Sequence, residues 1–168
     1  MKTLKIFLNA FRNLSIKKIL RLLQLALGNP FLFVLTLYAS AKTLKIAKKH
    51  FPVTNSSNGV GNAFRHALWF CLIANYACKI HSPKKSIAWA EKVTSLHEEF
   101  FPNPPLQKKM DLHNNKIGKQ LFEEMLTGIH RQFFETSFFV EKLLPMTKDA
   151  LLISDLDGDA GDKLMFIE

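Results

Sequence analysis

The sequence predicts an all-α protein, a single compact bundle of about six helices. Apolar residues recur every three or four positions along most of the 168-residue chain, which is typical of helices that bury one face. Proline, glycine and asparagine interrupt this pattern where helices would end. Strand-like alternation is confined to residues 150–154 and 165–167. Hydrophobic residues make up 48% of the chain and include fifteen phenylalanines, which is enough for one core.

Residues 1–28 are expected to form a basic amphipathic helix, followed by the helical domain at residues 29–168. Apolar residues between Leu4 and Ala26 follow helical spacing, with lysines and arginines among them and a break near Ser15. A secretory signal peptide is not expected, because charges interrupt the apolar stretch and no small-residue cleavage site follows it. We therefore expect a cytoplasmic protein that is peripheral at the membrane.

The charge is distributed unevenly along the chain. Residues 1–90 contain fourteen lysines and arginines and no acid, which gives +14, whereas residues 91–168 contain nine lysines and arginines and fourteen acids, which gives −5. This split favours an anionic partner, and we expect an anionic membrane surface that binds residues 1–27 rather than a nucleic acid. The alternative is a lysine-rich solvated surface.

The uncharged stretch at residues 22–41 is as long as a membrane-spanning helix. Gln24 and Gly28 interrupt it, and Asn29 and Pro30 form a turn with proline at the first position of a new helix. We therefore expect two helices here, the second at residues 30–50, and no transmembrane span.

The remaining helix boundaries follow from turn formers, prolines and caps. Turn formers fill residues 52–61, which predicts a loop at the edge of a site. Asp111 is expected to cap the N-terminus of a helix that ends at Gly128. The helices expected after the loop are 62–80, 84–100, 112–127 and 129–144.

The two cysteines, Cys71 and Cys78, lie seven positions apart in an apolar run. On one helix they would be about 10 Å apart along the axis, which is too far for a disulfide bond. We expect both to be small core residues in a reducing compartment.

The first motif that could form a functional site follows the loop. Asn62, Arg65, His66 and Trp69 are spaced i, i+3, i+4 and i+7, so they form a polar stripe on an otherwise apolar helix. Half-buried arginine and histidine side chains need partners. They indicate either a functional site or a structural network that joins helices.

The second motif is His97 and Glu98, near the end of the next predicted helix. An imidazole beside a carboxylate can ligate a metal ion or act as a base with its orienting acid. The HExxH zinc-protease motif is absent, because Phe101 occupies the position of its second histidine. The alternative is a solvated helix end.

The third motif contains Asp111, His113, Asn114 and Asn115, and is followed by Gly118. Asp111, Asn114, Asn115 and Gly118 recur at i, i+3, i+4 and i+7, so they share one helix face whose glycine permits close approach of another helix. Ordinary capping is the alternative.

Three helices thus each present a polar stripe with a histidine, which predicts that the stripes converge on one site. The residues expected to be catalytic are Arg65, His66, His97, Glu98 and Asp111; those expected to bind substrate are Asn62, Trp69, His113, Asn114 and Asn115; and those expected to bind a divalent metal ion are His66, His97 and Asp111.

These motifs, written NAFRHALW at residues 62–69, HE at 97–98 and MDLHNN at 110–115 with Gly118, resemble a bacterial family of helical domains of unknown function. Members of that family are found alone and at the C termini of large secreted proteins similar to polymorphic toxins. The resemblance covers residues 29–128 and implies no settled reaction. It does imply that the functional positions are Arg65, His66, His97, Glu98, Asp111 and Asn115.

The expected function is hydrolysis of an anionic phosphoester or lipid ester by a toxin-like enzyme. His66, His97 and a carboxylate from Glu98 or Asp111 would bind a divalent metal ion or form an acid–base set, and Arg65 would hold the anionic group. The alternative from another class is a non-enzymatic protein that binds a membrane surface or a partner through its basic N-terminal helix.

Overall fold

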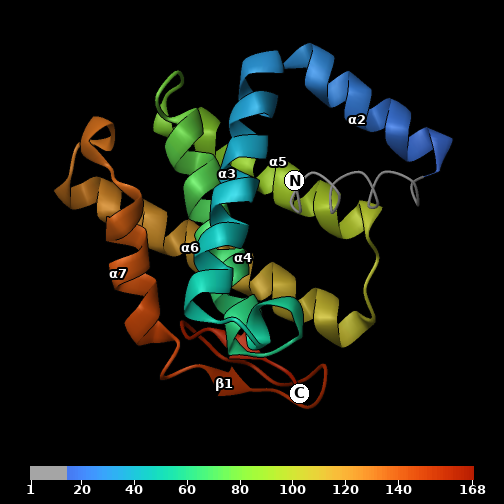
Figure 1. Ribbon diagram of the computed structural model, residues 1–168, viewed down its shortest axis with the longest axis vertical. Coiled ribbons are helices and arrows are strands. Elements are labelled where there is room, and N and C mark those ends of the chain that lie inside the picture. Colours follow the sequence, from blue (N-terminus) through green and yellow to red (C-terminus); the bar gives the residue numbers. More distant parts are fainter. Residues whose placement is uncertain (1–14) are drawn as a thin grey trace.

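The computed structural model describes residues 15–168 and contains six α-helices in that range, which confirms the predicted all-α class (Figure 1). Two short 3-10 segments and one pair of two-residue parallel strands complete the secondary structure of these residues. The helices are α2 (Ile16–Gly28), α3 (Pro30–His50), α4 (Val60–Ala77), α5 (Pro83–Phe100), α6 (Pro105–Gly128) and α7 (Thr136–Met146); the 3-10 segments are Thr54–Ser56 and Arg131–Phe133; the strands are β1 (Leu151–Leu152) and β2 (Met165–Phe166).

Helix α4 is the centre of the bundle and packs against α3, α5, α6 and α7 (Figure 1). Fourteen of its eighteen residues are buried, because its sequence is apolar on nearly every side and therefore needs neighbours all round. Arg65 and Trp69 are among the few that are not fully buried. Both lie on the side of α4 that borders α3 and α5.

Helices α4 and α6 cross in direct backbone contact at Gly118. A Cβ atom at this position would lie 2.3 Å from the carbonyl oxygen of Ala67, so only glycine fits. The thiol of Cys71 donates a hydrogen bond to the Gly118 carbonyl over 3.2 Å. The close approach predicted from the sequence is confirmed, and Cys71 and Cys78 are both free and buried, as expected.

The predicted boundaries of α6 and α7 are wrong in part. Helix α6 begins at Pro105, because proline suits the first position of a helix, so Asp111 lies inside the helix rather than capping it. Helix α7 begins at Thr136 instead of 129, because a 3-10 turn intervenes, in which the His130 ring accepts the Gln132 N–H. Pro145 lies in the last turn of α7 and does not stop it.

The N-terminal prediction falls partly outside the described residues, which exclude 1–14. Helix α2 starts after Ser15, whose hydroxyl accepts the Lys18 N–H over 3.5 Å. Helix α3 has the bounds predicted for it, and within residues 15–168 it is the one helix long and apolar enough for a membrane span. Because α3 packs along α4 in the bundle, a transmembrane span is not supported.

The C-terminal residues pack beneath α6 (Figure 1). The side-chain amide of Asn114 donates to the Met165 carbonyl over 2.8 Å, and its oxygen accepts the Met165 N–H over 3.0 Å. Met165 is fully buried in a small second core with Met110 and Ile153. Asn114 thereby fixes β2 to the bundle.

Candidate functional site

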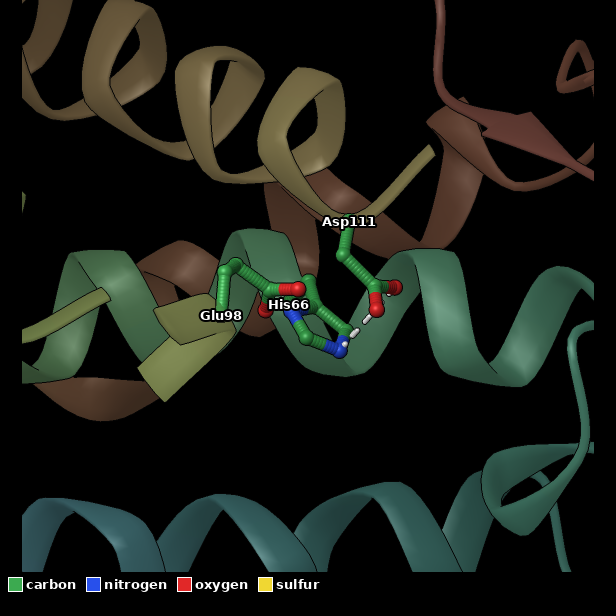
Figure 2. A group of neighbouring side chains, drawn as sticks. All are labelled: His66, Glu98 and Asp111. Atoms are coloured by element: carbon green, nitrogen blue, oxygen red, sulfur yellow. Dashed lines mark ion pairs between the residues drawn. The ribbon is translucent and has the colours of Figure 1, made fainter. Parts of the chain in front are cut away.

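Helices α4, α5 and α6 each contribute one buried ionisable side chain to a common cluster. One ligand atom each of His66, Glu98 and Asp111 lies within 4.8 Å of the others. Figure 2 shows the imidazole of His66 between the two carboxyl groups. The three residues are only 4%, 2% and 3% exposed, so each must be paired, protonated or coordinated.

Asp111 is held by three donors. The amides of Asn62 and Asn103 donate to its two carboxylate oxygens over 3.1 and 3.0 Å. His66 Nε2 lies 3.2 Å from the oxygen that Asn62 also contacts. A proton on Nε2 satisfies this contact, which leaves Nδ1 of His66 with a lone pair for another partner.

Arg65 adds a cation at the edge of the cluster. Its guanidinium donates to the Asn62 side-chain oxygen and lies 3.5 Å from Nε2 of His66. Burial lowers the pKa of Arg65, and the carboxylates of Asp111 and Glu98 oppose that shift. Asn62 thus bridges the arginine to Asp111 and orients both.

Polar atoms without a hydrogen-bond partner concentrate in this cluster. Eight buried side-chain nitrogen and oxygen atoms lack a partner within the described part of the chain, and six of them belong to Arg65, His66, Glu98 and Asn115. Both oxygens of Glu98 and Nδ1 of His66 are among them. Buried polar atoms are rarely left unpaired, so these atoms are free to bind an ion, a ligand or a buried water molecule.

The electrostatics of the cluster favour neutral side chains. Burial, together with the charge of Asp111, raises the pKa of Glu98 to about 7, and burial raises the pKa of Asp111 to about 6. Burial and the neighbouring charge of Arg65 lower the pKa of His97 to about 4 and hold that of His66 well below its usual range. A bound cation would reverse this preference at the carboxyl groups.

A pocket of about 330 Å³ borders the cluster and lies among α2, α3, α4 and α5. Its volume is within the range of small-molecule sites, about 300–1,000 Å³. Arg65 and His66 belong to both the cluster and the pocket wall. His97 lines the pocket beside them, with its ring centre 6.3 Å from that of His66 and 5.1 Å from that of Trp69.

Most of the predicted site residues are brought together, but with different partners from those expected. Around the buried cluster lie Asn62, Arg65, His66, Glu98, Asp111 and Asn115, whereas His97 and Trp69 face the pocket. The group able to hold a metal ion contains Glu98 in place of His97. Trp69 donates its indole N–H to Ser40 over 2.8 Å.

His113 and Asn114 lie outside the cluster. His113 contacts the Lys163 carbonyl over 2.8 Å, and Asn114 is fully used in binding the backbone of Met165. With 3.6 residues per helical turn, position 113 points roughly opposite to Asp111, while position 115 returns to its side. The prediction included Asn114 because its i, i+3 spacing places it on the same helix face as Asp111, and His113 because it belongs to the same motif.

Asn103 is the site residue that the sequence did not reveal. It lies in the proline-rich turn before α6, where an asparagine is ordinary, and its contact with Asp111 depends on how that turn folds back. The pocket residues of α3, such as Thr36 and Ser40, carry no motif either.

Comparison with known proteins identifies a family and no function. Residues 23–151 match the family model described as Domain of unknown function (DUF6973). No curated protein and no solved structure matches the chain. Because the family model covers most of the chain, this protein belongs to the DUF6973 family of domains of unknown function.

Proposed function

We propose that this protein is a metal-dependent hydrolase of an anionic ester, either a phosphoester or a lipid ester. The observation that carries the proposal is the set of unpartnered buried atoms on His66 and Glu98, next to Asp111 and beside a pocket whose wall contains His66 and Arg65. A purely structural network would be expected to satisfy its own donors and acceptors.

The donor set suits a divalent transition metal. One imidazole and two carboxylates form a ligand set of the kind seen in catalytic zinc and non-haem iron or manganese sites, which keep further positions open. His66 Nδ1 and the Glu98 oxygens have no other partner among the described residues, and Asn62 and Asn103 orient Asp111 from behind. A bound ion would supply Lewis-acid polarisation and a more acidic water molecule.

The other side chains bind the substrate and move the proton. Arg65 binds the anionic group of the substrate by charge-assisted hydrogen bonds. His97 is neutral near pH 7, since its pKa is about 4, so an imidazole nitrogen accepts the proton of the attacking water. The ester bond to the leaving alcohol breaks, and the alkoxide takes that proton from His97.

Hydrolysis assays test this proposal. We expect purified protein to cleave nitrophenyl esters of carboxylic or phosphoric acids with added Mn²⁺ or Zn²⁺ and to lose activity with a chelator. His66→Gln and Asp111→Asn should abolish turnover, and His97→Gln should reduce kcat about 100-fold or more. His113→Gln, on the same helix as Asp111 but outside the cluster, is the control that retains activity. Activity unaffected by chelation and by the three site variants would contradict the proposal.

A second candidate function, binding to an anionic membrane surface, is favoured by an exposed apolar stripe on α2 and the start of α3. The stripe consists of Ile16, Leu20, Leu23, Leu27, Phe31, Val34 and Tyr38, all more than half exposed. These positions follow helical spacing beside basic residues of an acid-free region. Such helices lie in the lipid interface with the apolar side down.

Vesicle co-sedimentation tests this second candidate. The full chain should bind vesicles that contain phosphatidylglycerol more tightly than neutral ones, and salt should weaken the binding. A Leu20→Ser/Leu27→Ser variant should lose binding, whereas Ile80→Ser, which alters an exposed apolar residue outside the stripe, should not. Equal binding by both variants would exclude the stripe as the membrane contact.

A further inference from the structure

The pocket that borders the His66 cluster has hydrocarbon walls over most of its surface. Its apolar lining comes from all four surrounding helices and includes Leu22, Leu25, Phe33, Leu44, Trp69 and Val93. Such a lining excludes ligands that are polar along their length, since each buried polar group needs a partner.

Two of the hydroxyl groups in the pocket wall are already engaged. Thr36 donates to the Leu32 carbonyl over 2.8 Å and accepts the Trp89 indole N–H over 2.9 Å. Ser40 likewise donates to the Thr36 carbonyl over 2.8 Å and accepts the Trp69 indole N–H. Neither hydroxyl has a proton left to donate to a sugar or a nucleobase; the third pocket hydroxyl, that of Thr43, has no hydrogen-bond partner among the described residues.

Charge enters the pocket at one place. Among the described residues that line the pocket, Arg65 is the one lysine or arginine, and it lies on α4 next to His66 and His97. A ligand that satisfies both parts of the pocket needs one anionic end for Arg65 and an unbranched or slender apolar body for the rest.

The helix that covers the pocket is held loosely. Leu25 is the one buried residue of α2. The other contacts of this helix include a hydrogen bond from Lys18 to the Phe100 carbonyl over 2.6 Å and an exposed ion pair between Arg21 and Glu99. Exposed ion pairs contribute little to stability, so displacing α2 to admit a long chain costs little. The outer side of α2 is the apolar stripe described above, which would place the pocket beside a lipid surface.

We infer that the pocket binds the hydrocarbon chain of a single-chain anionic lipid taken from a membrane, with the anionic head group at Arg65. This inference deepens the proposed function, because it names a lipid as the substrate class, and it rests on that function for the reaction. The binding step itself needs neither a metal ion nor turnover.

Calorimetric titration with alkyl phosphates in the presence of a chelator tests the binding step alone. Hexyl, octyl, decyl and dodecyl phosphate, each below its micelle concentration, should bind about fourfold more tightly per added methylene until the pocket is full. Alkyl glucosides of the same chain lengths should bind more weakly, and Arg65→Gln should weaken phosphate binding about tenfold or more.

Two opposite changes of pocket size show where the chain lies. Leu44→Trp narrows the pocket and should shift the best chain length downward, whereas Phe33→Ala enlarges the pocket and should shift it upward. Leu156→Trp, which changes an exposed residue that does not line the pocket, should leave the dependence of affinity on chain length unchanged. Vesicles that contain lysophosphatidylglycerol should transfer that lipid to the wild-type protein and not to Leu44→Trp.

The outcomes separate this inference from the proposed function. Affinity that is independent of chain length, or a chain-length optimum unmoved by both pocket variants, overturns the lipid pocket even if short soluble esters are hydrolysed. Binding of free alkyl phosphates with no transfer from vesicles overturns the membrane source. Chain-length-dependent binding without metal binding or hydrolysis would support the lipid pocket and contradict the proposal that the protein is a hydrolase.

Discussion

At the scale of single residues, the cluster combines two carboxyl groups that favour the protonated form with histidines that favour the neutral form. Glu98 is the clearest case, because its pKa is about 7 and neither of its oxygens has a partner among the described residues. This state suits a group that gives up its proton when a cation binds.

The raised pKa of Glu98 predicts how stability depends on pH. Between pH 6.5 and 8 the cluster histidines are neutral in the folded state, and unfolded carboxyl groups are ionised. Folded Glu98 therefore holds a proton that the unfolded chain has released, so the contribution of Glu98 to the free energy of unfolding should fall as pH rises through about 7. His66 and His97 contribute in the opposite direction, because their pKa values are lowered in the folded state and they take up protons on unfolding. Denaturant titrations in chelator isolate the Glu98 contribution as the difference in free energy of unfolding between the wild type and Glu98→Gln, which should decrease across this pH range.

Glu124→Gln is the matched control for this experiment, because Glu124 is an exposed glutamate of α6 outside the cluster. The pH dependence of its free energy of unfolding should match that of the wild type. An identical pH dependence in the wild type and Glu98→Gln would show that the Glu98 carboxyl does not hold a proton in the folded state.

The site residues that the sequence predicted were those carried by helical spacing. Arg65 and His66 were predicted because they interrupt an apolar helix, and Asp111 and Asn115 because they share a face. Asn103 could not be predicted, since its role depends on the fold of a turn. The sequence also could not show that Glu98 rather than His97 joins His66 in the cluster. Adjacent residues point about 100° apart around a helix, so the orientation of α5 decides which of the two faces the cluster.

At the scale of elements, the crossing of α4 and α6 sets the geometry of the site. His66 is next to Ala67, whose carbonyl lies against Gly118, and Asp111 and Asn115 lie about two turns and one turn before that glycine, respectively. The sequence predicted this contact from Gly118. The start of α6 was predicted wrongly for two reasons. Asp111 resembles an N-cap more than an interior helix residue, and Pro105 was interpreted as ending the preceding helix rather than as beginning α6.

We predict that Gly118→Ala destabilises the protein by about 3 kcal/mol, because the added methyl group meets backbone that no side-chain rotation can move. Denaturant unfolding measures the loss. Gly128→Ala is the control in the same helix: a Cβ atom there meets nothing within 4 Å, so the variant should be neutral or up to about 1 kcal/mol more stable. Equal stability of the two variants would show that the helices can separate at no cost.

At the scale of the whole molecule, the cluster and its pocket combine helices from the basic, acid-free part of the sequence with helices from the acidic part. Helices α2, α3 and α4 come from the first half and supply Arg65, His66 and most of the pocket, whereas α6 supplies Asp111. The class and the helix order followed from hydrophobic periodicity and prolines. The pocket could not be predicted from the sequence, because its shape depends on the angle at which α2 leaves α3.

Metal titration of the purified, metal-depleted chain tests the central proposal most directly. Calorimetry with Mn²⁺ and Zn²⁺ should show one ion bound per chain, and a concentration of 100 times the Kd should stabilise the fold by about 2.7 kcal/mol. His66→Gln, Glu98→Gln and Asp111→Asn should each lose this site, whereas His113→Gln should keep it. Absence of binding to the wild type, or equal binding by all four variants, would contradict a metal centre at His66, Glu98 and Asp111.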